Sequence, residues 1–200
     1  MKPHVIVMAK APVAGFAKTR LIPALGAEGA AALAATLLDV AIAQAARYGS
    51  VDLCCAPDTH HPAFQRLAGR HGIVLSEQGE GDLGARMSRA FERHLAQHGA
   101  ALMIGSDAPA IDAPMLQRAA QALSDADAVF IPALDGGYAL IGLRRPAPTL
   151  FTNMVWSTDR VMAQTRERLH AAGLRYIELP PVADIDEPAD LQHLPPGWLP

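Results

Sequence analysis

Short apolar runs alternate with longer helical patterns from residue 5 to residue 123, and this alternation limits the fold more than any other feature. The apolar runs, each typical of a buried strand, lie at 5–8, 51–56, 73–76 and 100–104. The helical patterns lie at 28–47, 62–71, 83–98 and 114–123. This order predicts an α/β fold with a mostly parallel sheet and helices on both of its faces.

The pattern changes in the last third of the chain. Apolar runs at 128–132 and 138–143 flank a turn that ends in two glycines, which predicts a hairpin or a rearrangement at the sheet edge. A last helical pattern at 158–172 leads to a strand at 175–179 and a proline-rich tail. Because no linker interrupts the chain and half of its residues are hydrophobic, we expect one domain over residues 1–200.

Charge and cysteine content limit the partners and the compartment. The formal net charge is −3 and no Lys/Arg-rich block is present, which argues against nucleic acid or a membrane surface as a partner. Cys54 and Cys55 are adjacent in a predicted strand, so they point to opposite faces and read as reduced thiols of a cytoplasmic protein. The apolar run at 5–9 is too short for a secretory signal. The longer run at 29–46 contains charged and polar residues, which favours a buried helix over a membrane span.

One carboxylate, Asp107, directly follows the predicted strand at 100–104. Turns at the carboxyl ends of parallel strands are where open α/β sheets bind ligands. A turn or capping role for Asp107 is the structural alternative. Asp112, which stands before Pro114 and a helical pattern, is better placed to cap that helix. We therefore predict that Asp107 lies where a metal-bound diphosphate binds.

The loop after the first predicted strand is basic and contains Lys10, Gly15, Lys18 and Arg20. Glycine is missing at both positions where a Walker A loop needs it, and no dinucleotide-binding glycine motif is present. Lysine and arginine charges together with backbone N–H groups predict contacts with nucleotide phosphates. An ordinary basic surface loop is the alternative interpretation.

Six segments in this order resemble a bacterial family of small glycosyltransferase-like proteins catalogued as a domain of unknown function, DUF2064. The segments lie at 9–21, 81–87, 105–109, 135–143, 156–158 and 184–191. Members of this family are similar to nucleotide-diphospho-sugar transferases of GT-A fold and to nucleotidyltransferases of cofactor biosynthesis. The resemblance implies a Rossmann-like GT-A domain, a three-layer sandwich around a mostly parallel sheet.

A nucleotide diphosphate or triphosphate needs a divalent cation, Mg²⁺ or Mn²⁺, held by few protein carboxylates. Asp107 is the first candidate. The resemblance implies that a late acidic residue, Asp184 or Asp186, returns to the same metal. Asp186 stands where it could instead cap a short helix, so the sequence favours Asp184. Asp107 and Lys18 are the predicted catalytic residues.

The resemblance also implies that Gln78, Asp82 and Arg86 contact the base or ribose of the nucleotide. Asp82 directly precedes a helical pattern, so a simple cap of that helix is an equal alternative.

An acceptor pocket is the last implied part of the site. Gly136 and Gly137 let the backbone approach a ligand closely, although a hairpin turn needs the same residues. Tyr138 and Trp156 are candidates to line the pocket, with ordinary core packing as the alternative.

Together these features favour transfer of a sugar from a nucleotide-diphospho-sugar to a hydroxyl of a small-molecule acceptor. The metal and the basic loop would stabilise the departing diphosphate. Two alternatives stay open: nucleotidyl transfer from a nucleoside triphosphate to a phosphorylated small molecule, and a non-catalytic nucleotide-binding protein.

Overall fold

Residues 2–198 are described by a computed structural model, in which all the strands of this range belong to one sheet. The strands are β1 (His4–Lys10), β2 (Val51–Ala56), β3 (Val74–Glu77), β4 (Ala101–Gly105), β5 (Ala128–Pro132), β6 (Tyr138–Leu143) and β7 (Tyr176–Glu178). Their order across the sheet is β3-β2-β1-β4-β6-β5-β7, and only β6 runs antiparallel to its neighbours. The predicted mostly parallel α/β sheet is confirmed.

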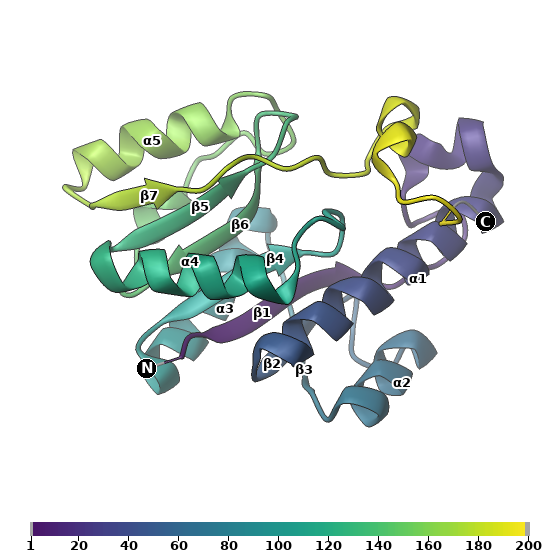
Figure 1. The fold of residues 1–200 in the computed structure, drawn as a ribbon, viewed down its shortest axis with the longest axis horizontal. Helices are drawn as coiled ribbons and strands as arrows, with labels where there is room; N and C mark the ends of the chain where they lie inside the picture. Colours follow the sequence, from purple (N-terminus) through teal and green to yellow (C-terminus); the bar gives the residue numbers. More distant parts are fainter. Residues whose placement is uncertain (1, 199–200) are drawn as a thin grey trace.

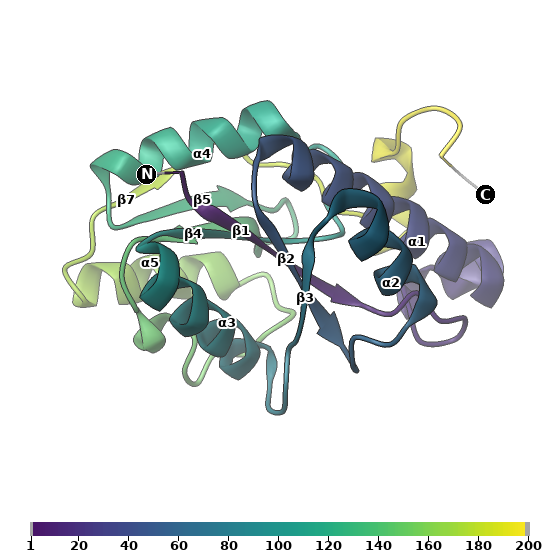
Figure 2. The ribbon, with the colours of Figure 1, turned by 90° about the horizontal axis from the view of Figure 1, so that it is seen from below.

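Helices cover both faces of this sheet (Figures 1 and 2). They are α1 (Ile22–Tyr48), α2 (Pro62–His71), α3 (Leu83–His98), α4 (Ala113–Asp125) and α5 (Val161–Ala171), with short 3-10 segments η1 (Thr19–Leu21), η2 (Pro148–Leu150) and η3 (Pro188–His193). Helices α1, α2 and α4 contribute to the core on one face, and α3 and α5 to the core on the other. The result is the three-layer sandwich that the resemblance implied.

The strand residues are apolar in unbroken runs because both faces of the sheet are covered. Cys54 and Cys55 illustrate this arrangement, since both are fully buried and each belongs to the core on a different face. Burial raises the pKa of both thiols, that of Cys55 to about 12. Both cysteines are unpaired thiols, as expected.

Helix α1 begins earlier than the sequence pattern indicated, at residue 22 instead of 28. Gly26 interrupts it with φ 71° and ψ 168°, so the expected helix corresponds to the part after this break. Within the described residues, only the stretch 19–48 is long and apolar enough to cross a membrane by length and composition. Its residues Leu38 and Ile42 are buried against the sheet, but only 33% of its most apolar window is buried, so the helix packs on the core along one side and is less buried than the sequence indicated.

The second half of the chain forms the predicted hairpin from β5 and β6, and places β6 between β4 and β5. After β7 the chain follows the sheet further, with a parallel bridge between Ala133 and Val182. The backbone N–H of Ile185 then donates to the carbonyl of Asp107 at 2.9 Å. The tail therefore crosses the carboxyl edge of the sheet and reaches the loop before α1 (Figure 1).

Candidate functional site

The ammonium group of Lys18 is surrounded by three oxygen atoms from distant parts of the chain. Its Nζ lies 2.5 Å from Asp107 Oδ1, 2.7 Å from Asp186 Oδ1 and 2.7 Å from the carbonyl oxygen of Ile185. All three donors of the ammonium are therefore used. The Lys18 side chain is only 8% exposed, whereas the two carboxylates are 42% and 39% exposed.

The topology of the sheet explains this convergence. Strands β1 and β4 are parallel neighbours, so their carboxyl ends meet at one edge. The loop after β1 supplies Lys18, which has a left-handed backbone (φ 47°, ψ 45°) at the start of η1. The turn after β4 supplies Asp107, and the tail after β7 supplies Ile185 and Asp186.

The charge of Lys18 is maintained by its partners. Burial by itself lowers the pKa of this ammonium, but the charges of Asp107 and Asp186 outweigh burial and raise the pKa. Because both carboxylate oxygens touch one nitrogen at 2.5 and 2.7 Å, they lie within about 5.2 Å of each other. Such proximity of two carboxylates requires a cation between them.

The oxygen atoms around Lys18 are the kind of ligands that Mg²⁺ and Mn²⁺ take: two carboxylates and a backbone carbonyl. Within residues 2–198, no group of three or more His, Cys, Asp or Glu side chains is arranged to hold a metal. A metal at this position would therefore take Asp107 and Asp186 and complete its coordination with water and substrate oxygens, which suits a phosphate-bound ion.

The tail carboxylate that joins Asp107 is Asp186, whereas the sequence favoured Asp184. The cap expected of Asp186 belongs instead to Glu187, which forms a capping box with Asp190 at the start of η3. The Asp190 carboxylate accepts from the backbone N–H groups of Glu187 at 2.7 Å and Asp186 at 3.0 Å. The Asp186 side chain is thus free to contact Lys18.

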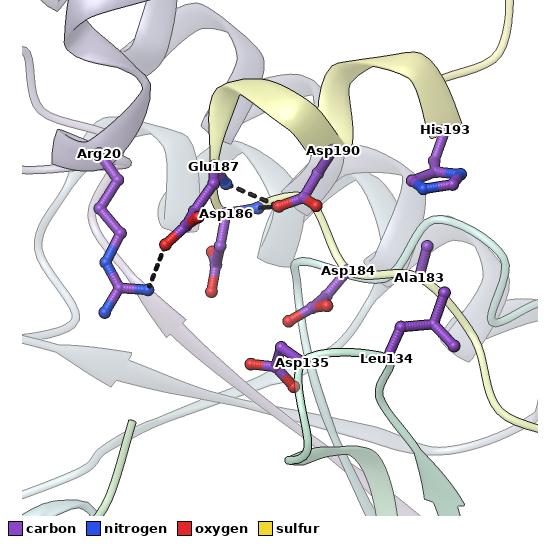
Figure 3. Close-up of a pocket in the computed structure, with 9 residues that line it drawn as sticks. All are labelled: Arg20, Leu134, Asp135, Ala183, Asp184, Asp186, Glu187, Asp190 and His193. Carbon is purple, nitrogen blue, oxygen red and sulfur yellow. Dashed lines mark hydrogen bonds and ion pairs between the residues drawn. The ribbon is translucent and has the colours of Figure 1, made fainter. Parts of the chain in front are cut away.

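Asp184 lies in a neighbouring pocket of about 290 Å³ beside the Lys18 site. Figure 3 shows its carboxylate close to that of Asp135, with Glu187 and Arg20 on the opposite side of the pocket. The lining residues are Arg20, Leu134, Asp135, Ala183, Asp184, Asp186, Glu187, Asp190 and His193. Burial, followed by repulsion from Asp135, raises the pKa of Asp184 to about 6.

The remaining residues of the basic loop are more exposed than Lys18. Arg20 lines the pocket and approaches Glu187 at 3.7 Å, with both side chains more than half exposed. Lys10 is the exposed last residue of β1. Gly15 has φ +79°, a turn conformation that glycine adopts easily. The structure therefore brings only Lys18, of the three predicted cations, to Asp107.

Hydrogen bonds to strand carbonyls and from α3 fix the segment 78–82, which is predicted to contact the nucleoside. Gln78 is buried, and its Nε2 donates to the carbonyls of Ala9 at 3.1 Å and Cys54 at 3.0 Å. Arg86 Nε donates to the carbonyl of Gly81 at 2.9 Å. These contacts show how Gln78 and Arg86 shape the segment.

Asp82 caps α3, since its carboxylate accepts from the N–H of Ala85 at 2.8 Å, as the structural interpretation of this residue predicted. Arg89 was not identified from the sequence, yet it donates to the carbonyls of Gln78 at 2.5 Å and Glu80 at 2.9 Å. Its position three residues after Arg86, on the same helix face, is the signal that could have revealed it.

The predicted acceptor residues also have structural roles. A Cβ on Gly136, which has φ +92°, would lie 2.2 Å from the backbone oxygen of Asp159, so only glycine fits there. Tyr138 packs edge-on against Phe130, with ring centroids 5.5 Å apart. Trp156 packs so closely against Gly84 that a Cβ there would lie 2.9 Å from its ring. Gly137 donates its N–H to Asp135 at the rim of the pocket. A contact of these four residues with an acceptor stays a prediction.

The strand order, the three layers and the convergence of charged residues at the carboxyl edge define the nucleotide-diphospho-sugar transferase fold. The chain belongs to the family DUF2064, described as an uncharacterized protein conserved in bacteria, whose model matches residues 38–158. Comparison with curated proteins gives no match.

Solved structures similar to the chain share this fold. A protein from Desulfovibrio desulfuricans, provisionally described as a nucleotide-diphospho-sugar transferase, is 29% identical over 95% of this chain and 84% of its own, with a TM-score of 0.87. A CMP-2-keto-3-deoxy-manno-octonic acid synthetase complexed with CTP is 11% identical, covers 96% of both chains and has a TM-score of 0.61. Glucosyl-3-phosphoglycerate synthase from Mycobacterium tuberculosis, in complex with Mn²⁺, UDP and glucosyl-3-phosphoglycerate, is 10% identical over 96% of this chain and 75% of its own, with a TM-score of 0.57.

Proposed function

We propose that this protein is a divalent-metal-dependent transferase that moves a glycosyl group from a nucleotide-diphospho-sugar to a small-molecule acceptor. The observation that carries the proposal is the convergence of Asp107 and Asp186 on one buried cation, beside a basic loop and a pocket. The 29% identical neighbour described as a nucleotide-diphospho-sugar transferase supports the class of reaction. The Mn²⁺ and UDP bound to a more distant neighbour support the choice of ligands.

In this proposal Asp107 and Asp186 hold Mg²⁺ or Mn²⁺, which when bound neutralises the charge that develops on the leaving diphosphate. Lys18 and Arg20 add positive charge for the same phosphates. The segment 78–82, fixed by its hydrogen bonds to Arg86 and Arg89, presents backbone groups to the nucleoside. Because these groups are held before the substrate arrives, they need little rearrangement when it binds.

Under this proposal the acceptor binds in the pocket next to Asp186, between the turn after β5 and the tail, which none of the predicted acceptor residues Gly136, Gly137, Tyr138 and Trp156 lines. Its volume of about 290 Å³ is close to the lower limit, about 300 Å³, of typical small-molecule sites. A compact polar acceptor fits this space better than a long chain.

Thermal unfolding with a panel of nucleotides tests the proposal. Nucleoside diphosphates and their sugars should raise the melting temperature only when Mn²⁺ or Mg²⁺ is present. Asp107→Asn, which is nearly isosteric, should lose that metal-dependent rise. If no nucleotide stabilises the protein with or without metal, the proposal fails and a role outside nucleotide chemistry is indicated.

Nucleotidyl transfer is the second candidate, favoured by the CTP-bound synthetase that matches 96% of both chains. The two reactions release different products, a nucleoside diphosphate in one case and pyrophosphate in the other. Preferential stabilisation by nucleoside triphosphates, together with pyrophosphate release, would replace sugar transfer by this second function.

A further inference from the structure

Lys18 fills the position that a divalent metal would take. Its nitrogen lies 2.5 to 2.7 Å from Asp107 Oδ1, Asp186 Oδ1 and the carbonyl oxygen of Ile185. Metal–oxygen distances for Mg²⁺, Mn²⁺ and Ca²⁺ are about 2.0–2.6 Å. A metal bound to the same oxygens would coincide with the ammonium nitrogen, so one cation excludes the other.

We propose that Lys18 and a divalent metal alternate at the Asp107–Asp186 site, and that metal entry displaces Lys18 from its carboxylates. The displaced ammonium is then available to phosphate oxygens, a step that rests on the proposed function. Before metal arrives, Lys18 offsets one of the two negative charges of carboxylates that lie within about 5.2 Å of each other. A divalent metal in its place offsets both charges, so the exchange favours the metal where metal is available.

The loop that carries Lys18 is built in a way that permits this movement. Phe16, two residues before Lys18, is 79% exposed, and Val13 is 39% exposed, so the outer side of the loop is not packed against the core. Lys18 itself has the left-handed backbone that non-glycine residues rarely adopt. By contrast, Asp107 lies two residues after β4 and its carbonyl accepts a hydrogen bond from the N–H of Ile185 in the tail, so the two carboxylates are held to each other through the backbone.

This exchange makes an unusual prediction, since removing Lys18 should strengthen metal binding while weakening nucleotide binding. If Lys18 occupies the site in at least about nine of ten molecules, its removal should tighten the apparent affinity for Mn²⁺ by at least about tenfold. A lysine that only assists phosphate binding would leave the metal affinity of nucleotide-free protein unchanged.

The first test is titration of chelator-treated, nucleotide-free protein with Mn²⁺, with free Mn²⁺ measured by electron paramagnetic resonance. Lys18→Met should bind Mn²⁺ at least about tenfold more tightly than the parent, whereas Lys18→Arg, which keeps the charge, should not. Lys10→Met is the matched control for loss of one positive charge from the same loop, and it should change the affinity far less. Equal or weaker Mn²⁺ binding by Lys18→Met would overturn the exchange.

The second test uses the parent protein and so does not depend on the variant folding. Lysine acetylation by a soluble reagent, quantified for each residue by mass spectrometry, should label Lys18 slowly without metal because its side chain is 8% exposed. Mn²⁺ should accelerate labelling of Lys18 several-fold and leave labelling of the exposed Lys10 unchanged. Bound Mn²⁺ with unchanged Lys18 labelling would contradict the proposal.

The outcomes separate this inference from the proposed function. Tight Mn²⁺ binding by Lys18→Met, with no response of the parent protein to any nucleotide, would preserve the exchange and refute the transferase. Metal-dependent stabilisation by nucleotides, with no gain in Mn²⁺ affinity on removing Lys18, would support the transferase and refute the exchange.

Discussion

The two ends of the sheet each place an aspartate against basic side chains, and they differ in access. At the carboxyl end, Asp107 pairs with Lys18 and is 42% exposed. At the amino end, Asp52 is 4% exposed and lies 3.2 Å from His94 Nε2 and 3.5 Å from Arg93. Ser76 donates a further hydrogen bond to Asp52 at 2.7 Å. We call these the Asp107 site and the Asp52 cluster.

The difference teaches that a charged pair marks a ligand site only where a ligand can reach it. Asp52 is buried beside His94, whose ring packs against that of His4, and the His4 ring lies 4.7 Å from the rings of both His94 and His98. The Asp107 site borders an open pocket through Asp186. We therefore assign the Asp52 cluster to stability and the Asp107 site to ligand binding, and each of the following changes tests that division.

The largest effect on stability is expected for Asp52→Ala. Removing one partner of a buried charge network leaves His94, Arg93 and Ser76 without their acceptor, and such losses cost about 3–5 kcal/mol. Urea unfolding should show this loss, while any metal-dependent nucleotide binding stays as in the parent. Unchanged stability combined with lost nucleotide binding would contradict the assignment of the Asp52 cluster to stability.

Asp107→Asn should have the opposite profile. Loss of a charged ligand is expected to weaken metal-dependent nucleotide binding about 100-fold, judged by the scale of changes at metal sites. The free energy of unfolding should stay within about 1 kcal/mol of the parent value because Asp107 is partly exposed and Asp186 still pairs with Lys18. Calorimetric titration in Mn²⁺ measures the first quantity and urea unfolding the second.

A smaller, pH-dependent effect is expected at the Asp52 cluster. Burial, with repulsion from His94 and His98, lowers the pKa of His4 from 6.5 to about 4, although Asp52 opposes this shift. As the pH is lowered below 6.5, the unfolded chain binds a proton on His4 that the folded chain does not bind until about pH 4. The free energy of unfolding therefore decreases as the pH falls from 6.5 to about 4. His4→Gln should flatten this part of the stability curve, and a change at the exposed His60 should not. An unaltered slope in His4→Gln would contradict the burial of a neutral His4.

The smallest effect is expected for Asp82→Ala, which removes the cap of α3 and should cost about 1 kcal/mol. If Asp82 also contacts ribose, nucleotide affinity should fall as well. Comparison with Asp112→Ala, which removes the equivalent cap of α4, separates the two roles. Equal losses of stability, with nucleotide binding impaired only in Asp82→Ala, would support the predicted ribose contact.

Much of the fold could be predicted because local signals agree with it. The bounds of β2, α2 and α3 match the sequence patterns, since periodicity and nearby cap residues mark these elements clearly. The start of α1 did not match, because Gly26 divides the helix and the turn before it gave no clear pattern. The pattern near α5 was also too long, at 158–172 instead of Val161–Ala171.

The site could be predicted only in part. Lys18 and Asp107 were identifiable from their positions after strands, but the contact of Lys18 with Asp186 spans 168 positions and depends on the path of the tail. Aspartate is preferred over glutamate as an N-cap, which is why Asp186 and not Glu187 was expected to cap the tail helix. His94 and His98 stand four residues apart on α3, so the sequence shows that they share a helix face. Only the structure shows that His4 packs against His94 and that Asp52 contacts it.

The position of Asp186 in the tail also affects how the protein is made. A chain is synthesised from its N-terminus onward, at about 5–20 residues per second. Strands β1 to β4, with Lys18 and Asp107, leave the ribosome well before the segment 182–193 that follows β7. The second carboxylate reaches Lys18 only after all seven strands of the described residues have emerged. A nascent chain from which the segment 182–193 has not yet emerged therefore lacks the second carboxylate of the Asp107–Asp186 pair, and the proposed metal site can form only after that segment is made.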